Sequence, residues 1–265
     1  MTMRYAYVLA LLIIICALFG LAVGSFLNVV IYRVPHHESI VSPRSKCPVC
    51  EHPIRERDNI PVLSWLILRG RCRDCGTPIS PRYLVVELMG GALFAGLAAR
   101  LGYNWDLPAF LALLSGLLAL ACIDLEHLLL PKKVIYPTLL IVAVFLVIAA
   151  AAYDSWDKLL VAVICAVGWF VAFFLLNLVS PRALGFGDVR LAPLLGLGLG
   201  WLGWRYVILG FFAGNVIGAV VGVVLIATKR MDRKQPVPYG VFLALGVAVA
   251  VFAGPEILVH FQQYR

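Results

Sequence analysis

Two aspartates lie at the ends of apolar segments, where a charged side chain is unusual. Asp124 follows the uncharged window 107–123, and Asp188 precedes the window 191–204. A carboxylate at hydrocarbon depth costs about 2.5 kcal/mol or more, so such a residue is a functional candidate. Two carboxylates that meet can hydrolyse a peptide, because one takes a proton from water while the other, protonated, polarises the carbonyl. The pair therefore predicts an intramembrane aspartyl protease.

The residues around the two aspartates fit such a site. We expect Gly185 and Gly187 to let the backbone turn and approach a substrate closely, since glycine tolerates positive φ. Pro131, seven residues after the first aspartate, is expected to interrupt helix geometry. The alternative is that each aspartate caps a helix or pairs with a cation such as Lys132 or Arg190.

Four cysteines form a second candidate site. Cys47 and Cys50, then Cys72 and Cys75, give a C-x2-C-x21-C-x2-C pattern within the polar stretch 33–82. Four thiolates from two short turns match the tetrahedral preference of structural zinc, and a metal would supply folding free energy that this stretch lacks in apolar residues. Two disulfides, a redox dithiol or four unrelated thiols are the alternatives. The other three cysteines lie in apolar runs and are expected to be packing residues.

The composition places these residues in a membrane protein. The chain has 265 residues, of which 62% are hydrophobic and 14% charged, and its mean hydropathy is +0.95. Crossing ~30 Å of hydrocarbon takes about 20 helical residues. We therefore predict an all-α, polytopic membrane protein of about eight transmembrane helices with a small zinc-binding cytoplasmic insertion. The apolar windows are 5–32, 83–99, 107–123, 134–153, 159–181, 191–204, 206–228 and 235–255.

The basic residues predict which way the helices cross. The connections 33–82, 124–133, 180–190 and 228–238 hold 9, 2, 2 and 4 Lys+Arg, which is 17 of the 22 in the chain. The positive-inside rule makes these connections cytoplasmic, with both termini outside the cytoplasm and both aspartates at the cytoplasmic face. The net charge of +8 then reflects topology and attraction to anionic membrane lipid. No nucleic-acid partner is expected.

Three parts follow from this topology. We expect 1–32 to be a retained first transmembrane helix, since its uncharged run is too long for a signal peptide. We expect 33–82 to be the four-cysteine module and 83–265 to be the transmembrane domain that contains the aspartate pair. Glu87, four residues into an apolar window, could snorkel, pair with a cation or face a second active site.

In this order the motifs resemble those of the type IV prepilin peptidases, the bifunctional leader peptidase/N-methyltransferases with a GxGD-type aspartyl site. The resemblance runs over nearly the whole chain. The residues that carry it are Gly24-Ser-Phe-Leu-Asn-Val-Val-Ile-Tyr-Arg-Val-Pro35, the two cysteine pairs, Ile60-Pro-Val-Leu-Ser-Trp65, Ile79-Ser-Pro-Arg-Tyr83, Glu87, Ile123-Asp124, Leu130-Pro131, Gly185-Phe-Gly-Asp188 and Tyr239-Gly-Val-Phe-Leu-Ala-Leu-Gly246.

The resemblance implies a bacterial inner-membrane enzyme that removes the basic leader of prepilins or pseudopilins just after a glycine. It implies that Asp124 and Asp188 are catalytic. It also implies methylation of the new N-terminus with S-adenosylmethionine, in the N-terminal region that contains the cysteines. We assign no residues to that cofactor, because no glycine-rich turn joins a strand to a helix, and the glycines of 196–200 are expected to pack helices.

The chain also departs from the family pattern. Lys132 and Lys133 follow Leu-Pro, where an acidic residue is common, and Arg190 replaces a usual lysine. Arginine keeps the positive charge, so we expect cleavage to be retained. The rival interpretations are a peptidase without methyl transfer, another GxGD protease, a carboxylate-relay transporter and a non-catalytic assembly factor of a pilus or secretion machine.

Overall fold

The computed structural model describes residues 2–180, 184–230, 232 and 237–262. Within these residues the secondary structure is helical, apart from two isolated β-bridges in the polar insertion. The chain forms two compact units, Met1–Asn104 and Trp105–Arg265. Three basic residues of the charge bias, Arg182, Arg233 and Lys234, lie outside the described residues.

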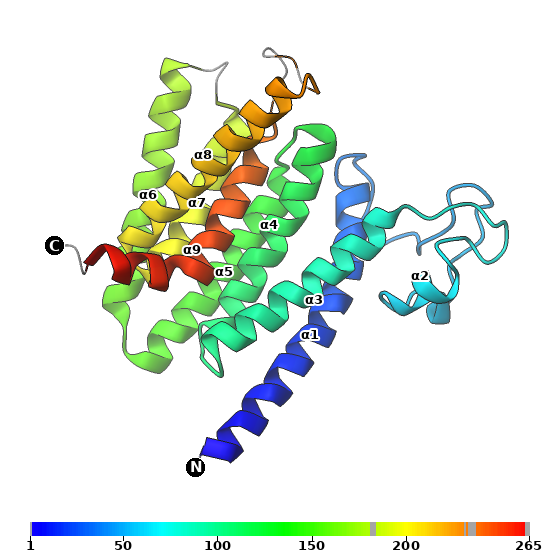
Figure 1. Ribbon diagram of the computed structural model, residues 1–265, viewed down its shortest axis with the longest axis horizontal. Helices are drawn as coiled ribbons and strands as arrows, with labels where there is room; N and C mark the ends of the chain where they lie inside the picture. The colour runs from blue at the N-terminus through cyan, green and yellow to red at the C-terminus, as the bar shows by residue number, and fades with distance from the viewer. Residues whose placement is uncertain (1, 181–183, 231, 233–236, 263–265) are drawn as a thin grey trace. The chain divides into compact units, whose positions relative to one another are not determined.

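Seven helices in the described ranges are long and apolar enough to cross a membrane, and an eighth long helix, α7, has 17 residues. This agrees with the predicted all-α membrane fold. The helices, labelled in Figure 1, are α1 (Thr2–Arg33), η1 (Glu56–Asp58), α2 (Leu63–Ile67), α3 (Pro81–Leu101), α4 (Leu107–His127), α5 (Lys132–Tyr153), α6 (Trp156–Val179), α7 (Phe186–Leu202), α8 (Trp204–Ala227) and α9 (Tyr239–Gln262).

In the first unit, α1 and α3 pack closely through small residues. A Cβ atom on Gly24 would lie 2.7 Å from the Cα atom of Glu87, and one on Gly20 would collide with the carbonyl oxygen of Gly90. The Asn28 side chain donates a hydrogen bond to the Tyr83 carbonyl, 3.0 Å away. Small residues let membrane helices approach closely, so these contacts hold α1 and α3 in one register.

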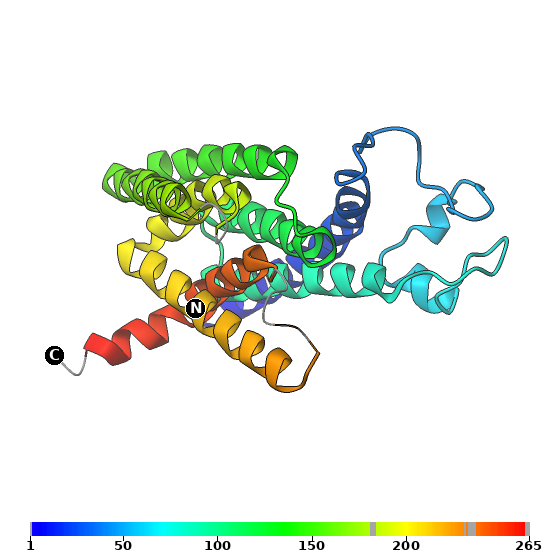
Figure 2. The ribbon, with the colours of Figure 1, turned by 90° about the horizontal axis from the view of Figure 1, so that it is seen from above.

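The polar insertion emerges from the adjacent ends of α1 and α3, in light blue and cyan in Figure 2. It is tied to α3 through Glu87, whose carboxylate accepts a hydrogen bond from the Val62 N–H at 2.7 Å. Glu87 is 7% exposed, and Val62 has a φ of 64°, rare for a β-branched residue. Of the three roles left open for Glu87, this contact matches none, since its partner is a backbone amide.

In the second unit, α7 is the central helix and contacts each of the other long helices (Figure 1). Most of its side chains are buried. A Cβ atom on Gly196 would lie 2.6 Å from the Cys165 carbonyl oxygen, and one on Gly200 would lie 2.8 Å from the Cα atom of Ala162. The expected helix-packing role of these glycines is confirmed, because both give α7 its close contact with α6.

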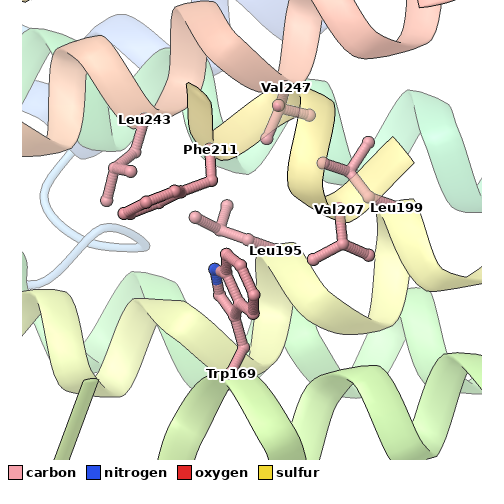
Figure 3. Close-up of a pocket in the computed structure, with 8 residues that line it drawn as sticks. Trp169, Leu195, Leu199, Val207, Phe211, Leu243 and Val247 are labelled. Carbon is pink, nitrogen blue, oxygen red and sulfur yellow. The ribbon is translucent and has the colours of Figure 1, made fainter. Parts of the chain in front are cut away.

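A small cavity remains between α6, α7, α8 and α9 (Figure 3). Its volume is about 10 Å³, and the rings of Trp169 and Phe211 point into it together with aliphatic side chains. A space of this size holds at most one water, which would need polar partners. The apolar lining therefore makes it a packing gap.

The boundary between the two units lies after α3. It groups α3 with α1, which differs from the division at residue 83 expected from the sequence. The structural boundary reflects packing, whereas the boundary expected at residue 83 separates segments by function. The functional division stays a prediction.

Candidate functional site

Both aspartates lie at helix ends within the second unit. Asp124 is in the last turn of α4, and Asp188 is in the first turn of α7. The two side chains are 5% and 7% exposed, respectively. The helix α4 ends because Leu128 adopts the left-handed conformation and Pro131 follows, as the sequence predicted for this proline.

The structure brings the two carboxyl groups together. They lie close enough for the charge of Asp124 to act on Asp188. The first turn of α9 lies beside them, since the backbone amides of Gly240 and Val241 face the Asp124 carboxylate. The N-terminus of a helix carries a partial positive charge, so α9 favours a negative charge at this point. The site thus combines the end of α4 with the beginnings of α7 and α9.

Each carboxylate has one oxygen atom that no residue in the described part of the chain satisfies. Oδ2 of Asp124 and Oδ1 of Asp188 are buried without a hydrogen bond, and neither side chain forms an ion pair with a described residue. Arg190 instead places its guanidinium over the ring of Phe186, 4.7 Å from the centroid. Buried polar atoms in proteins are nearly always paired, so two unpaired carboxylate oxygens at one place indicate a site that receives a ligand.

The glycines near Asp188 differ from the expectation that they adopt positive φ. Gly185 has a φ of −67°, and Gly187 lies within α7. Their role is steric. A Cβ atom on Gly187 would lie 3.0 Å from the Cβ atom of Leu130, and one on Gly185 would lie 3.3 Å from Oδ2 of Asp188. Glycine at both positions leaves room for the loop after α4 and for the carboxylate.

Two further polar residues belong to this site and were not among the predicted site residues. The Tyr239 hydroxyl donates a hydrogen bond to Oδ1 of Asn215 at 3.3 Å, and this hydroxyl is close enough to Asp188 to interact with its charge. Asn215 is a lone amide in the apolar helix α8, which was the available signal in the sequence. The two residues are 24 positions apart in the sequence, so their contact could not be predicted from it.

We expect Gly240→Ala to reduce activity while the fold is kept. The added methyl group would lie 2.9 Å from Oδ2 of Asp124 and 2.8 Å from a methyl carbon of Leu130, so the carboxylate must move. Gly222→Ala is the matched control, because nothing lies within 4 Å of a Cβ atom there. Peptidase assays and thermal melts of both variants check this, and full activity of Gly240→Ala would contradict it.

The four predicted cysteines of the first unit also come together. All four sulfur atoms lie within 4.8 Å of one another, with Cys47 to Cys75 at 3.8 Å and Cys50 to Cys72 at 4.0 Å. A tetrahedron with Zn–S bonds of ~2.3 Å has edges of about 3.8 Å. All four cysteines are free thiols, so the cluster can hold a metal ion.

The two cysteine turns share one backbone design. In each, the N–H of the first cysteine bonds to the carbonyl five residues on, at 3.0 Å for Cys47 to His52 and 2.8 Å for Cys72 to Thr77. The residue after the second cysteine has positive φ in both, 58° at Glu51 and 72° at Gly76. Hydrogen bonds to the side chain and then the backbone of Thr77 lower the pKa of the Cys75 thiol to about 6, whereas burial and the other three thiols raise that of Cys50. Without a metal, one thiolate in the cluster thus disfavours another.

An ion pair fixes the second turn to η1. The Arg73 guanidinium donates two hydrogen bonds to Oδ1 and Oδ2 of Asp58, from Nε at 3.0 and 2.8 Å, and a third from Nη2 at 2.6 Å. This hydrogen bonding lowers the pKa of Asp58 below its usual value. The pair therefore supports the insertion at neutral pH, and its contribution is lost as the pH falls through the lowered pKa of Asp58.

A groove of about 350 Å³ lies between α1 and the insertion. Phe26 and Val29 provide apolar surface, and Arg44, Glu56 and Asn59 provide polar groups along it. Arg33 also lines the groove and fixes its loop, because its guanidinium donates hydrogen bonds of 2.8 Å to the carbonyls of Ser39 and Pro43. The volume suits a small molecule with both apolar and charged parts.

Comparisons with known proteins cover both units. Residues 18–101 match the bacterial peptidase A24 N-terminal domain, and residues 111–223 match the type IV leader peptidase family. A prepilin leader peptidase/N-methyltransferase of Stutzerimonas stutzeri is 36% identical, over 95% of this chain and 94% of the relative. Proteins of the same name from Myxococcus xanthus and Aeromonas hydrophila are 42% and 35% identical, over 83% and 91% of this chain and 67% and 90% of theirs. No solved structure matches.

Proposed function

Because the chain belongs to the type IV leader peptidase family, we propose that it is a membrane aspartic endopeptidase that removes the basic leader of prepilins or pseudopilins. One observation carries this proposal: two buried aspartates lie near each other, and each has one carboxylate oxygen without a hydrogen bond to a described residue. The assembly-factor interpretation leaves this arrangement without a use, and the transporter interpretation leaves the four cysteines unexplained.

Asp124 and Asp188 act as one unit. Because the charge of Asp124 acts on Asp188, both groups do not ionise readily, so one would keep a proton while the other is ionised. The ionised group takes a proton from water, whose oxygen bonds to the scissile carbonyl carbon, while the protonated group donates a hydrogen bond to the carbonyl oxygen. The C–N bond then breaks, and the leaving amine receives the proton. The amides of Gly240 and Val241 stabilise negative charge on Asp124.

The experiment that tests this function uses the purified protein and a purified prepilin in detergent. We expect removal of the leader, read as a shorter product whose N-terminal mass gives the cleaved bond. An intact prepilin after prolonged incubation, with a folded enzyme, would contradict the proposal.

The charge bias supports an orientation with the active site and the cysteine cluster at the cytoplasmic face of the inner membrane and both termini outside the cytoplasm. A basic leader would then remain in the cytoplasm while the apolar helix of a prepilin enters the lipid. The division of labour is also proposed, with peptide cleavage in the segment that contains the aspartates and methylation in the N-terminal segment.

We propose that the cysteine cluster binds structural zinc through Cys47, Cys50, Cys72 and Cys75. The sulfur spacing fits a tetrahedral ion, and the insertion has many exposed and few buried side chains. In the reducing cytoplasm, thiolates stay available to a metal. The ion would hold the two turns in place of an apolar core.

We propose further that the groove beside α1 binds S-adenosylmethionine, which when bound supplies a methyl group for the new N-terminus. The chemistry of the lining fits this molecule. Phe26 and Val29 offer an apolar surface to its adenine. Arg44 and Glu56 face each other at 3.9 Å with side chains 87% and 92% exposed, so they would turn from each other for the cation to meet the carboxylate of the ligand and the anion its ammonium.

Binding measurements test the groove without relying on activity. By isothermal titration with S-adenosylmethionine, we expect Glu56→Gln to raise the Kd by about tenfold, the loss of one charged hydrogen bond. Glu38→Gln is the matched control, because Glu38 is exposed and lies outside the groove. Equal affinities for the two variants would contradict this assignment and leave the peptidase proposal untouched.

A further inference from the structure

The short helix α2 and the residues just before it expose four large apolar side chains to their surroundings. Ile60, Leu63, Leu66 and Ile67 are 47%, 55%, 54% and 73% exposed. We call these four residues the α2 patch. Single exposed apolar residues are common, but four within eight positions of a polar insertion form a patch that indicates a binding partner.

The α2 patch is fixed in its outward direction by the other side of the same segment. Trp65 packs against Gly70, where an added Cβ atom would lie 2.8 Å from the indole ring. The Ser64 hydroxyl accepts a hydrogen bond from the Ile60 N–H at 2.9 Å and donates one to the Arg57 carbonyl at 3.1 Å. The helix therefore cannot roll its apolar side chains inward without breaking these contacts.

The contact between Val62 and Glu87 sets the depth of α2. Glu87 is the seventh residue of α3, so its Cα atom lies about 9 Å along the helix from its beginning at 1.5 Å per residue. Gly24 packs beside it, a full nine residues before the end of α1. Both helices are candidate membrane spans, and the hydrogen bond from Val62 holds α2 alongside their outer turns. With Ala6–Arg33 and Pro81–Leu101 crossing the membrane, this contact would bring the patch to the boundary between headgroups and acyl chains.

Basic residues flank the patch in the chain. Arg57 precedes it, and Arg69 and Arg71 follow it, all with exposed side chains. An apolar surface bordered by arginines is the combination that binds an anionic lipid interface, because the apolar groups enter the acyl region while the cations face the headgroups.

We propose that the α2 patch inserts into the interface of an anionic bilayer and that this insertion, with the Val62–Glu87 hydrogen bond, holds the cysteine cluster against the membrane. The second cysteine turn begins only five residues after Ile67, so an anchored α2 restricts its position. The proposal does not depend on the catalytic function.

The test introduces the photoreactive residue p-benzoylphenylalanine at Ile67 in the full-length protein. The matched control carries it at Val49, which is 64% exposed but lies in the first cysteine turn. The proteins are placed, without prepilin, in nanodiscs of phosphatidylcholine and phosphatidylglycerol, irradiated and analysed by mass spectrometry. Both positions are exposed, so the larger side chain is accommodated.

We expect several-fold more lipid adduct at position 67 than at position 49, and a further rise as the fraction of phosphatidylglycerol increases. Lipid adducts at position 67 no more abundant than at position 49 would overturn the proposal. Cross-linking of position 67 chiefly to a second copy of the chain would also overturn it, since the patch would then be a protein interface.

Discussion

Asp124→Asn and Asp188→Asn are each expected to remove leader cleavage almost completely, lowering the rate by about 10²–10⁴-fold, the range for a positioned general acid or base. The amide keeps the size of the carboxyl group but can neither take a proton from water nor share one with its neighbour. The two side chains act as one unit, so the double variant should be little worse than either single one. Leader removal and the N-terminal mass of a co-expressed prepilin measure the effect.

Asp154→Asn is the matched control for both variants. Asp154 is exposed and has a φ of 50°, a conformation that asparagine tolerates well. The Asp154→Asn variant should therefore cleave the prepilin at the wild-type rate. Retained cleavage in Asp124→Asn or Asp188→Asn would show that the changed residue is not catalytic, and the unpaired carboxylate oxygens would then need another explanation.

Removal of the metal is expected to have the second largest effect, confined to the insertion. Structural zinc sites contribute an apparent binding free energy of about 10–16 kcal/mol, which in small domains is folding free energy. We expect one zinc per wild-type chain, and both loss of the ion and proteolysis within 33–82 for Cys50→Ser. Elemental analysis and limited proteolysis of the purified proteins measure these two properties.

Cys165→Ser is the control for this variant, because Cys165 lies in α6 and outside the cluster. It should keep both the zinc and the protease resistance of the wild type. A wild-type protein with four reduced cysteines and almost no zinc would refute the zinc site. The helices α1 and α3 should survive in either case, since their contact is made by glycines and by Asn28.

The sequence predicted the membrane fold and the meeting of the two aspartates through simple rules. The apolar windows predicted the helices with bounds that differ by up to seven residues, and the positive-inside rule predicted that Asp124 and Asp188 lie at one face. The window 191–204 corresponds to α7, which begins at Phe186, five residues earlier, and ends at Leu202. These features depend on hydropathy and charge, which each segment shows by itself.

Other features depend on contacts between distant segments and could not be predicted. The backbone amide of Val62 as the partner of Glu87 requires a positive φ at a valine, which no local preference suggests. The place of Gly240 beside Asp124 depends on how α9 packs against α4, over 116 positions of the chain. Gly185 and Gly187 were expected to turn the backbone, whereas in the structure they relieve crowding against the side chains of Leu130 and Asp188.

The convergence of α4, α7 and α9 also has a consequence for biosynthesis. Helices of a polytopic protein enter the membrane in chain order as the ribosome synthesises them. Asp124 enters first, Asp188 later, and the amides of Gly240 and Val241 that face Asp124 arrive only with α9. A nascent chain therefore carries both aspartates well before it has a complete site. An unfinished chain without α9 would therefore hold both carboxylates without the amides that stabilise the charge of Asp124.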